Sequence, residues 1–340
     1  MTVTTLAPWR LFRPHVASVH ALSPSLRRVR LVGPELADFA DPGYDQRIKL
    51  LIGGREQPDP ATEDWYAAWR ALPERDRPAM RTYTTRRVSV WGGGIAVDVD
   101  MVVHDHAGPA GDWVRRAVPG DEVVVVGPDA RFDGDPGGRT FAPPAGVRDV
   151  VLVGDETALP AIGRILEDLR EGHDLTGRSV RRGAVASGCR VTAIVEVPEP
   201  SDCLDLVRPD GAEVVWLVRG PRPMGVALDR AVRTWTMIAA GPAAEVRPGT
   251  PAGLFKVGVA GSAVGPDDDV LWDVPTESPG SPGSPDSSGL PGSPLPRAYV
   301  WVAGETGVVR GIRRHLLSEV GLDRSQVALM GYWRLGRALG

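Results

Sequence analysis

The hydrophobic pattern of this 340-residue chain changes at residues 141–146, a short stretch rich in proline and glycine. Before it, short apolar or alternating runs are separated by Gly, Pro and Asp, as at residues 28–32, 47–52, 97–103 and 122–126. After it, apolar strands alternate with helical patterns. The first rhythm is typical of antiparallel all-β structure and the second of an α/β fold. We therefore expect an antiparallel six-stranded barrel at residues 10–144 and an α/β domain with a mostly parallel sheet at residues 145–340.

Finer patterns support this division. In the second part, strands are predicted at residues 149–153, 190–197, 213–218, 298–302 and 327–330, and a helix at 158–171 has Ile162, Ile165 and Leu169 on one face. In the first part, Trp65 and Trp69 recur at helical spacing and predict a helical excursion at residues 61–72. The alternation fails at about residues 240–296, where Ser, Pro and Gly dominate the later part, so we interpret this segment as a low-complexity, disordered insertion.

Composition excludes several classes of function. The net charge is −4, with 39 Lys plus Arg against 43 Asp plus Glu, so no overall positive field attracts nucleic acid. Cys189 and Cys203 form no C-x-x-C pattern, so we expect no bound metal or cluster, and redox chemistry would need an organic cofactor. No apolar run approaches about eighteen residues, and residues 1–8 lack a signal-peptide pattern. We expect a cytoplasmic protein without stable membrane association.

The first residues that can carry chemistry form the strand Arg81-Thr82-Tyr83-Thr84. Alternation along a strand places Arg81 and Tyr83 on one face and the two threonines on the other. A phenol ring can pack against a flavin, and a guanidinium can hold a phosphate with paired donors. The same residues also suit an ordinary strand with a polar face, so both interpretations stay open.

A second group begins with a strand from Asp100 to His104 and continues with Gly108-Pro109-Ala110, which opens a short helix. Proline suits the first position of a helix. The free backbone N–H groups of the following residues, together with the helix dipole, can bind a pyrophosphate. His104 can bond a phosphate or a ribityl hydroxyl, or it can be a satisfied histidine at a strand end.

Four motifs follow one another in this part of the chain: R-x-Y-T, a strand ending in His, G-P-A-G-D-W and P-G-D. Their order resembles the FAD domain of the ferredoxin-reductase superfamily, and their particular residues resemble those of siderophore-interacting proteins. In that family an FAD sits on the barrel, with the R-x-Y-T strand at the isoalloxazine and ribityl part. Asp105 departs from the pattern, because a glycine commonly follows the motif histidine. The resemblance implies FAD contacts from Arg81, Tyr83, Thr84, Asp100, His104, Gly108, Pro109, Ala110 and Trp113.

The second domain carries two strand–turn–helix segments, G-D-E-T-A-L-P-A-I at residues 154–162 and W-V-A-G-E at 301–305, and a closing G-Y-W-R-x-G. Ligands of open α/β sheets gather at such carboxyl ends of strands, but no G-x-G-x-x-G is present. Thr157 is expected to cap the first helix. All three segments resemble the same family, which implies NADH or NADPH binding by Gly154, Asp155, Glu156, Thr157, Ala158, Gly304 and Glu305.

The resemblance implies FAD-dependent reduction of ferric siderophores by NAD(P)H, with ferrous iron released in the cytoplasm. Hard oxygen donors hold ferric iron more tightly than ferrous iron, so reduction loosens the complex. A flavin can accept a hydride pair and release single electrons, and no protein acid, base or nucleophile is required. We therefore assign no catalytic side chain and expect a monomer.

Two alternatives remain open: the electrons could go to a flavodoxin, a ferredoxin or free flavin, or the protein could be a ferric-siderophore carrier without turnover. An anionic siderophore would favour a basic rim, although ordinary surface charge explains the same residues. The family often uses lysines there, and this chain has only Lys49 and Lys256. The candidate substrate residues are Arg47, Lys49, Arg86 and Arg87.

Overall fold

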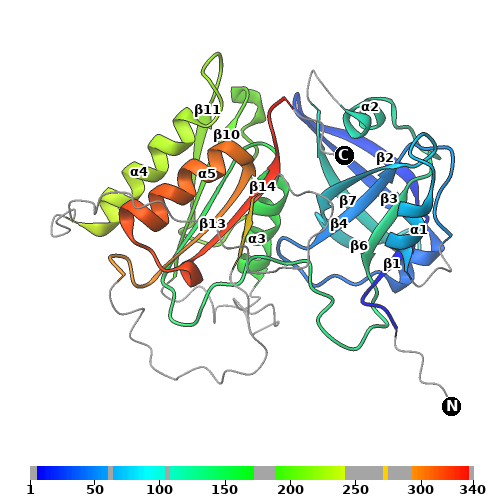
Figure 1. The fold of residues 1–340 in the computed structure, drawn as a ribbon, viewed down its shortest axis with the longest axis horizontal. Coiled ribbons are helices and arrows are strands. Elements are labelled where there is room, and N and C mark those ends of the chain that lie inside the picture. Colours follow the sequence, from blue (N-terminus) through cyan, green and yellow to red (C-terminus); the bar gives the residue numbers. More distant parts are fainter. Residues whose placement is uncertain are drawn as a thin grey trace.

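The computed structural model describes residues 6–59, 64–103, 108–171, 189–241, 271–274 and 293–336. Figure 1 shows two halves side by side, an N-terminal one of blue and cyan strands and a C-terminal one in which helices cover a sheet drawn from green to red. Among the described residues, no helix combines the length and the apolar character that a membrane crossing requires.

The N-terminal half consists of two four-stranded antiparallel sheets. One has the order β1 (Trp9–Phe12), β8 (Val124–Pro128), β4 (Arg47–Ile52) and β5 (Ala79–Thr84). The other has the order β2 (His15–Ser23), β3 (Leu26–Val32), β7 (Gly94–Val102) and β6 (Arg87–Trp91). The described strands therefore number eight in two sheets, where the sequence predicted six in one barrel. Between the sheets lies a core that includes Phe12, Val29, Ile48, Leu50, Val97 and Val99.

Two short helices and a 3-10 turn complete this half. The 3-10 turn covers Pro34–Asp38, and helix α1 (Trp65–Ala71) begins where the Asp64 carboxylate accepts a hydrogen bond of 2.9 Å from the Ala67 N–H. The predicted start of this helix, residues 61–63, lies outside the described residues. Helix α2 (Pro109–Arg116) begins at the proline, as the sequence predicted, and packs against β4, β5 and β7.

The C-terminal sheet has the order β11 (Glu213–Val218), β10 (Arg190–Val197), β9 (Asp149–Gly154), β13 (Ala298–Glu305), β14 (Val327–Trp333) and β12 (Trp272–Asp273). Every pairing is parallel except that of the short edge strand β12 with β14. All eight residues of β13 are buried, which explains its unbroken apolar run. The sheet is therefore mixed but mostly parallel, in agreement with the sequence.

Helices cover both faces of this sheet. Helix α3 (Leu159–Glu171) packs on the face turned toward the N-terminal half, with Tyr299 and Trp301 in its core. Helices α4 (Val226–Ala240) and α5 (Thr306–Arg314) pack on the other face (Figure 1). A π-helical turn, His315–Val320, and 3-10 turns at Pro200–Asp202 and Arg324–Gln326 follow the regular elements. The sequence patterns above did not predict α4 or β12; β12 lies within the expected insertion, most of which is outside the described residues.

A loop of the N-terminal half, residues 41–47, penetrates the C-terminal half. Tyr44 is 1% exposed, and its ring lies 5.0 Å from that of Phe141 within the core under α3. Its φ of +53° is in the left-handed region, which is unfavourable for a bulky side chain. The Tyr44 N–H donates a 2.5 Å hydrogen bond to the Asp168 carboxylate of α3. Packing and this hydrogen bond together hold the strained residue in place.

The neighbouring carboxylate of Asp45 is fully buried and joins three segments. It accepts hydrogen bonds from the backbone N–H groups of Thr140 and Phe141, from the Thr140 hydroxyl, and from the Trp301 indole N–H at 3.1 Å. Because an unpaired buried carboxylate would be very costly, these donors must stay in position. Asp45 thus ties the loop to the connection between the halves and to β13.

Ion pairs add to this contact of residues 41–47 with α3, residues 140–141 and β13, which we call the joint between the halves. The Arg86 guanidinium, after β5, donates two 2.6 Å hydrogen bonds to Glu167 of α3. In the opposite direction, Arg164 of α3 binds Asp168 at 2.8 Å and Asp41 at 3.1 Å. Arg86 is only 8% exposed. The sequence placed Arg86 on a substrate rim, whereas the structure places it between the halves, where Glu167 occupies its donors.

We predict that Glu167→Gln lowers the free energy of unfolding by about 3 kcal/mol at pH 7, because the buried Arg86 guanidinium loses its two hydrogen bonds to a carboxylate and keeps only the more distant Asp100 as a charge partner. Burial alone would raise the pKa of Glu167, but the hydrogen bonds from Arg86 outweigh it and hold the pKa below its usual range. The stabilisation is therefore present above the unfolded-state pKa of about 4.3 and is lost as the pH falls through the folded-state value.

Urea unfolding of both proteins between pH 7 and pH 3 measures this, and the difference between them should shrink toward acid. Asp149→Asn is the matched control, because its partner Arg190 is 76% exposed, and it should cost at most about 1 kcal/mol. An equal effect of the two substitutions at pH 7 would rule out a stabilising role for the buried pair.

Candidate functional site

Strand β5 places the R-x-Y-T residues beside the core of the N-terminal half. Tyr83 pairs with Ile48 of β4 and packs against the same core as Trp113 of α2. Arg81, opposite Leu50, donates a 2.9 Å hydrogen bond to the Met80 carbonyl. Burial raises the pKa of the Tyr83 phenol, so this group is neutral at physiological pH. The strand and the proline-started helix therefore meet, as a shared binding surface requires.

The N-terminus of α2 has the features of an anion site. Gly108 is its N-cap, and no described side chain caps the first turn. A Cβ added to Gly108 would meet no described atom within 4 Å, so none of the described residues fills the space beside the first turn, whose N–H groups can bind an anion. His104 lies outside the described residues, which leaves its predicted role open.

Polar atoms at the end of β5 lack partners. Thr84 is 6% exposed, and the hydroxyl of the adjacent Thr85 is buried without a hydrogen bond within the described chain. The Thr85 N–H donates to the Gln46 carbonyl at 2.8 Å, and the Gln46 side-chain oxygen is likewise buried without a partner. Unmatched buried polar atoms are rare in proteins and often mark a missing ligand or water. These atoms are therefore compatible with a polar ligand or an ordered water beside the end of β5.

Asp100 has a different environment from the one that its motif suggested. Its carboxylate accepts hydrogen bonds of 2.7 and 2.8 Å from Arg28 of β3 and lies 3.5 Å from Arg86. It is 5% exposed. The cross-strand ion pair therefore occupies both of its oxygens, and we leave Asp100 out of the proposed cofactor site.

The carboxyl edge of the C-terminal sheet is organised by Asp155. Its carboxylate accepts hydrogen bonds from Thr157, from the Glu305 N–H at 2.8 Å and from the Trp333 indole N–H at 3.0 Å. It thereby joins the turn after β9 to the turn after β13 and to the end of β14. The sequence predicted Thr157 as a helix cap, but the Thr157 hydroxyl donates to Asp155 and α3 begins at Leu159.

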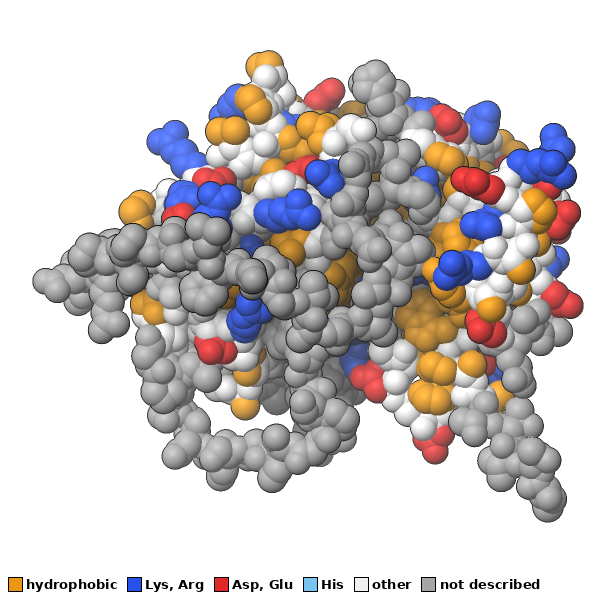
Figure 2. Space-filling view, viewed as in Figure 1, with side chains coloured by type: hydrophobic (Ala, Val, Ile, Leu, Met, Phe, Trp, Pro, Cys, Tyr) orange, Lys and Arg blue, Asp and Glu red, His pale blue; other side chains and the backbone are white. Residues whose placement is uncertain are grey.

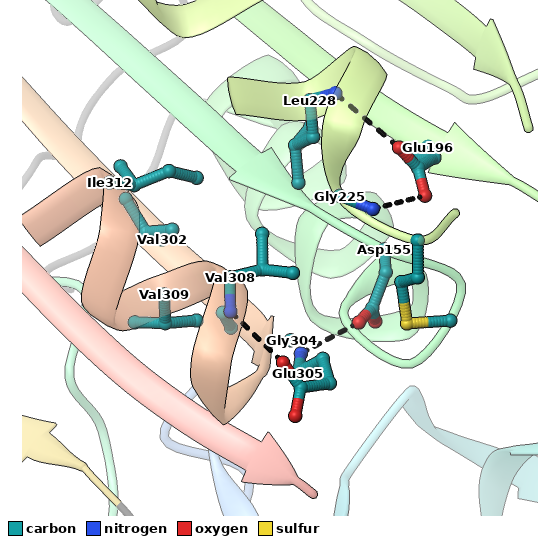
Figure 3. Close-up of a pocket in the computed structure, with 12 residues that line it drawn as sticks. Asp155, Glu196, Gly225, Leu228, Val302, Gly304, Glu305, Val308, Val309 and Ile312 are labelled. Atoms are coloured by element: carbon teal, nitrogen blue, oxygen red, sulfur yellow. Dashed lines mark hydrogen bonds between the residues drawn. The ribbon is translucent and has the colours of Figure 1, made fainter. Parts of the chain in front are cut away.

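A pocket lies beside Asp155, between the N-termini of α4 and α5 (Figure 3). Glu196 of β10 is fully buried there and accepts hydrogen bonds from the Gly225 and Leu228 N–H groups at the start of α4. Glu305 similarly accepts a 2.9 Å hydrogen bond from the Val308 N–H of α5. Both helix N-termini at this pocket are thus capped by carboxylates of the protein itself.

Arg219, after β11, balances part of this negative charge. It binds Glu156 at 2.9 Å and Glu196 at 3.2 Å. Burial raises the pKa of Glu156, although the guanidinium opposes this shift. The sequence analysis identified Glu156 but missed Glu196 and Arg219; a carboxylate near the end of the apolar run at residues 190–197 was the available signal.

Comparison with known families identifies the chain. The sequence profile described as "Siderophore-interacting FAD-binding domain" matches residues 15–132, and the one described as "Siderophore-interacting protein" matches residues 147–336, more than half of the chain. The chain belongs to the siderophore-interacting protein family. Its two halves give it the ferredoxin-reductase-like fold that the motifs implied.

Individual proteins agree with this assignment. The crystal structure of a siderophore utilization protein from T. fusca matches with a TM-score of 0.59 and 26% identity, over 98% of this chain and 96% of that one. Ferric vibriobactin reductase of Vibrio cholerae is 28% identical over 62% of this chain and 68% of its own length. The NADPH-dependent ferric-chelate reductase of Escherichia coli is 27% identical over 63% of this chain and 73% of its own length.

The candidate rim of this siderophore-interacting protein is not a single basic field. Arg87 is exposed at the start of β6, whereas Lys49 is half-buried and donates a 2.6 Å hydrogen bond to Thr82. Arg47 is also half-buried, against the C-terminal half. Figure 2 shows basic and acidic side chains interspersed over both halves on the face drawn. Because Arg86 is buried and paired with Glu167 and Arg47 is half-buried, the four predicted substrate residues do not form one exposed basic rim.

We predict that Gly304→Ala disrupts the carboxyl edge. The φ of Gly304 is +147°, and an added Cβ would lie 2.6 Å from the Asp155 carboxylate, which would have to leave its hydrogen bonds. The free energy of unfolding should fall by about 1–3 kcal/mol, and the Kd of NADH or NADPH should rise about tenfold or more. Urea unfolding and a coenzyme titration measure the two effects.

Gly311→Ala is the control, because Gly311 lies within α5 and an added Cβ there meets no atom of the described residues within 4 Å. It should stabilise the helix by about 0.5–1 kcal/mol and leave coenzyme binding unchanged. The same coenzyme affinity in wild type and Gly304→Ala would contradict a role for this turn.

Proposed function

We propose that this siderophore-interacting protein is an FAD-dependent reductase that uses NAD(P)H to reduce ferric siderophores, with release of ferrous iron in the cytoplasm. The observation that carries the proposal is the convergence of β5 and the uncapped start of α2 on one core, within a chain whose family profile is that of an FAD-binding domain. The names of the Vibrio cholerae and Escherichia coli relatives support a ferric reductase activity.

In this proposal residues 10–144 hold FAD and residues 145–340 bind the nicotinamide. The free N–H groups of α2 would hold the pyrophosphate, with Arg81 as a second donor group. Tyr83 and Thr84 would lie along the isoalloxazine and ribityl part. The residues assigned to FAD are Arg81, Tyr83, Thr84, His104, Gly108, Pro109, Ala110 and Trp113.

The nicotinamide would bind at the carboxyl edge of the second sheet. Ligands of open parallel sheets lie at this edge, and Asp155 fixes the relative positions of the turns after β9 and β13 there. Glu156 and Glu305 shape the turns through their own ion pair and cap. The residues assigned to this site are Gly154, Asp155, Glu156, Thr157, Ala158, Gly304 and Glu305.

A bound FAD would supply the conversion between a hydride pair and single electrons, so that each NAD(P)H reduces two ferric ions. The protein's part is to hold the two rings together and exclude water. The joint of residues 41–47 with α3 supports this role, because its buried hydrogen bonds fix the position of one half relative to the other. Half-buried Lys49 and exposed Arg87 are the remaining candidates for contact with an anionic siderophore.

An anaerobic absorbance titration tests the function. The full chain, reconstituted with FAD, should lose its oxidised flavin band on addition of NADH or NADPH and regain it with two equivalents of a ferric siderophore. A protein that binds the ferric siderophore but cannot be loaded with flavin would be a carrier. Reoxidation by a ferredoxin, a flavodoxin or free flavin, without response to ferric chelates, would assign a different acceptor.

We predict that Arg81→Ala weakens FAD binding about 10- to 100-fold, because it removes a charge-assisted contact worth about 1.5–3 kcal/mol. Flavin fluorescence titration of the apoprotein measures the Kd. Arg116→Ala is the control, since Arg116 is exposed at the far end of α2. If both variants bind FAD as the wild type does, Arg81 does not belong to the site.

A further inference from the structure

Arg47 is placed where the two halves meet. It is the first residue of β4 and the register partner of Thr84 on β5. Its guanidinium carbon lies 4.2 Å from the centre of the Trp272 ring, which belongs to β12 of the other half. One N–H, on Nε, donates a 3.1 Å hydrogen bond to the Gly138 carbonyl. Arg47 is therefore attached to the end of the strand on which the flavin ring is expected.

An aromatic row supports this guanidinium from the C-terminal half. The ring of Trp272 is stacked on that of Tyr332, with centres 6.5 Å apart and planes 15° apart. Tyr332 in turn meets Trp301 edge-on at 6.4 Å. Asp273 fixes the short strand through Arg313, whose Nε lies 2.7 Å from its carboxylate. Trp272 thus provides a flat, anchored surface that fixes the plane of the Arg47 side chain.

The terminal amino groups of Arg47 have no acceptor among the residues that the structure describes. Neither Nη1 nor Nη2 donates to an atom of the part of the chain that the structure describes, and no carboxylate there pairs with Arg47. Burial lowers its pKa, although nearby Asp45 and Tyr332 oppose this shift. The Nη atoms are not among the fully buried polar atoms that lack a partner, so their four N–H donors can be satisfied by water or by a ligand that reaches them.

We propose that Arg47, held flat by Trp272, binds the edge of the flavin ring on which negative charge gathers on reduction, and so raises the reduction potential of the flavin. The inference rests on the proposed function. A hydride from NAD(P)H brings two electrons and one proton, leaving NAD(P)⁺ and a reduced flavin with one negative charge. Two ferric ions then take one electron each and the proton leaves. A fixed positive charge favours the reduced state in this cycle.

The position of Arg47 favours the flavin over the ferric chelate as its ligand. Arg47 pairs with the buried Thr84 and packs against the Trp272 ring, so it lies within the joint and not on the exposed rim. A planar resident group can occupy such a place permanently, whereas a bulky chelate arrives from solvent. Trp272 acts through Arg47, so we regard it as a positioning residue.

The test is the two-electron midpoint potential of bound FAD, measured by anaerobic dye equilibration on the full chain. Arg47→Gln should reduce the preference for reduced over oxidised flavin about tenfold or more, which is about 30 mV toward negative values. Arg47→Lys keeps the charge and should shift the potential less. Trp272→Leu, which frees the guanidinium, should shift it in the same direction as Arg47→Gln.

Trp91→Leu is the matched control, because the Trp91 ring also lies under an arginine, Arg30 at 4.4 Å, but on the other sheet. It should leave the potential unchanged. If Arg47→Gln does not retain FAD, Arg47→Lys and Trp272→Leu give the same comparison.

The possible failures are distinguishable. A wild-type protein that binds no FAD would contradict the proposed function. A wild type that binds FAD and is bleached by NAD(P)H, with potentials unchanged in Arg47→Gln and Trp272→Leu, would overturn only this inference. An unchanged potential with a raised KM for the ferric chelate would move Arg47 to the substrate site and would overturn it equally.

Discussion

The arrangement of the whole molecule depends on a loop, residues 41–47, that carries an aromatic side chain of one half into the core of the other. Tyr44 adopts a left-handed backbone conformation that its bulk disfavours, and burial of the ring together with the Asp168 carboxylate compensates for this. Asp45 then fixes the connection between the halves and β13. Because these groups are buried and paired, a change in the angle between the halves would expose charges and break several hydrogen bonds together.

The joint determines which strand ends of the two halves face each other. On one side, β4 begins at the joint with Arg47, and β5 ends there with Thr84, which Thr85 follows. On the other side, β14 ends with Tyr332 and Trp333, and the Trp333 indole donates a hydrogen bond to Asp155. The surface assigned to flavin and the edge assigned to nicotinamide are therefore connected by a short path of packed rings and hydrogen bonds. A reductase of this kind needs the two rings in contact and separated from water, which a preformed joint can provide.

Much of this fold could be predicted from the sequence, because the informative runs were buried and continuous. Residues 47–52, 190–197 and 213–218 form strands with the predicted limits. Helix α4 was missed despite its length. The edge strand β6 was missed although Val88 and Val90 alternate with Arg87 and Ser89, because the run has only five residues and Val90 is 78% exposed. The two-residue strand β12 forms only because β14 pairs with it, so no local pattern reveals it.

The local motifs of the candidate site could be predicted from the sequence, but most of the contacts of its residues could not. The Gly-Pro start of α2 and the Asp155 turn are local features, and their positions follow from local rules. The partners of Arg86, Asp100 and Glu196 lie far away in the sequence. The sequence analysis therefore placed Arg86 on a substrate rim and Asp100 at the FAD and gave no role to Glu196, whereas all three are buried in ion pairs. The packing of Arg47 against Trp272 could not be predicted either, because the two residues are far apart in the sequence and only the fold brings them into contact.

The most direct test of this account is a crystal structure of the full chain with FAD bound. The account predicts the flavin ring along β5 beside Thr84, its pyrophosphate at the start of α2, and the contacts of Tyr44 and Asp45 unchanged. A flavin bound away from β5, or a structure in which the loop of residues 41–47 has left the C-terminal core, would contradict it.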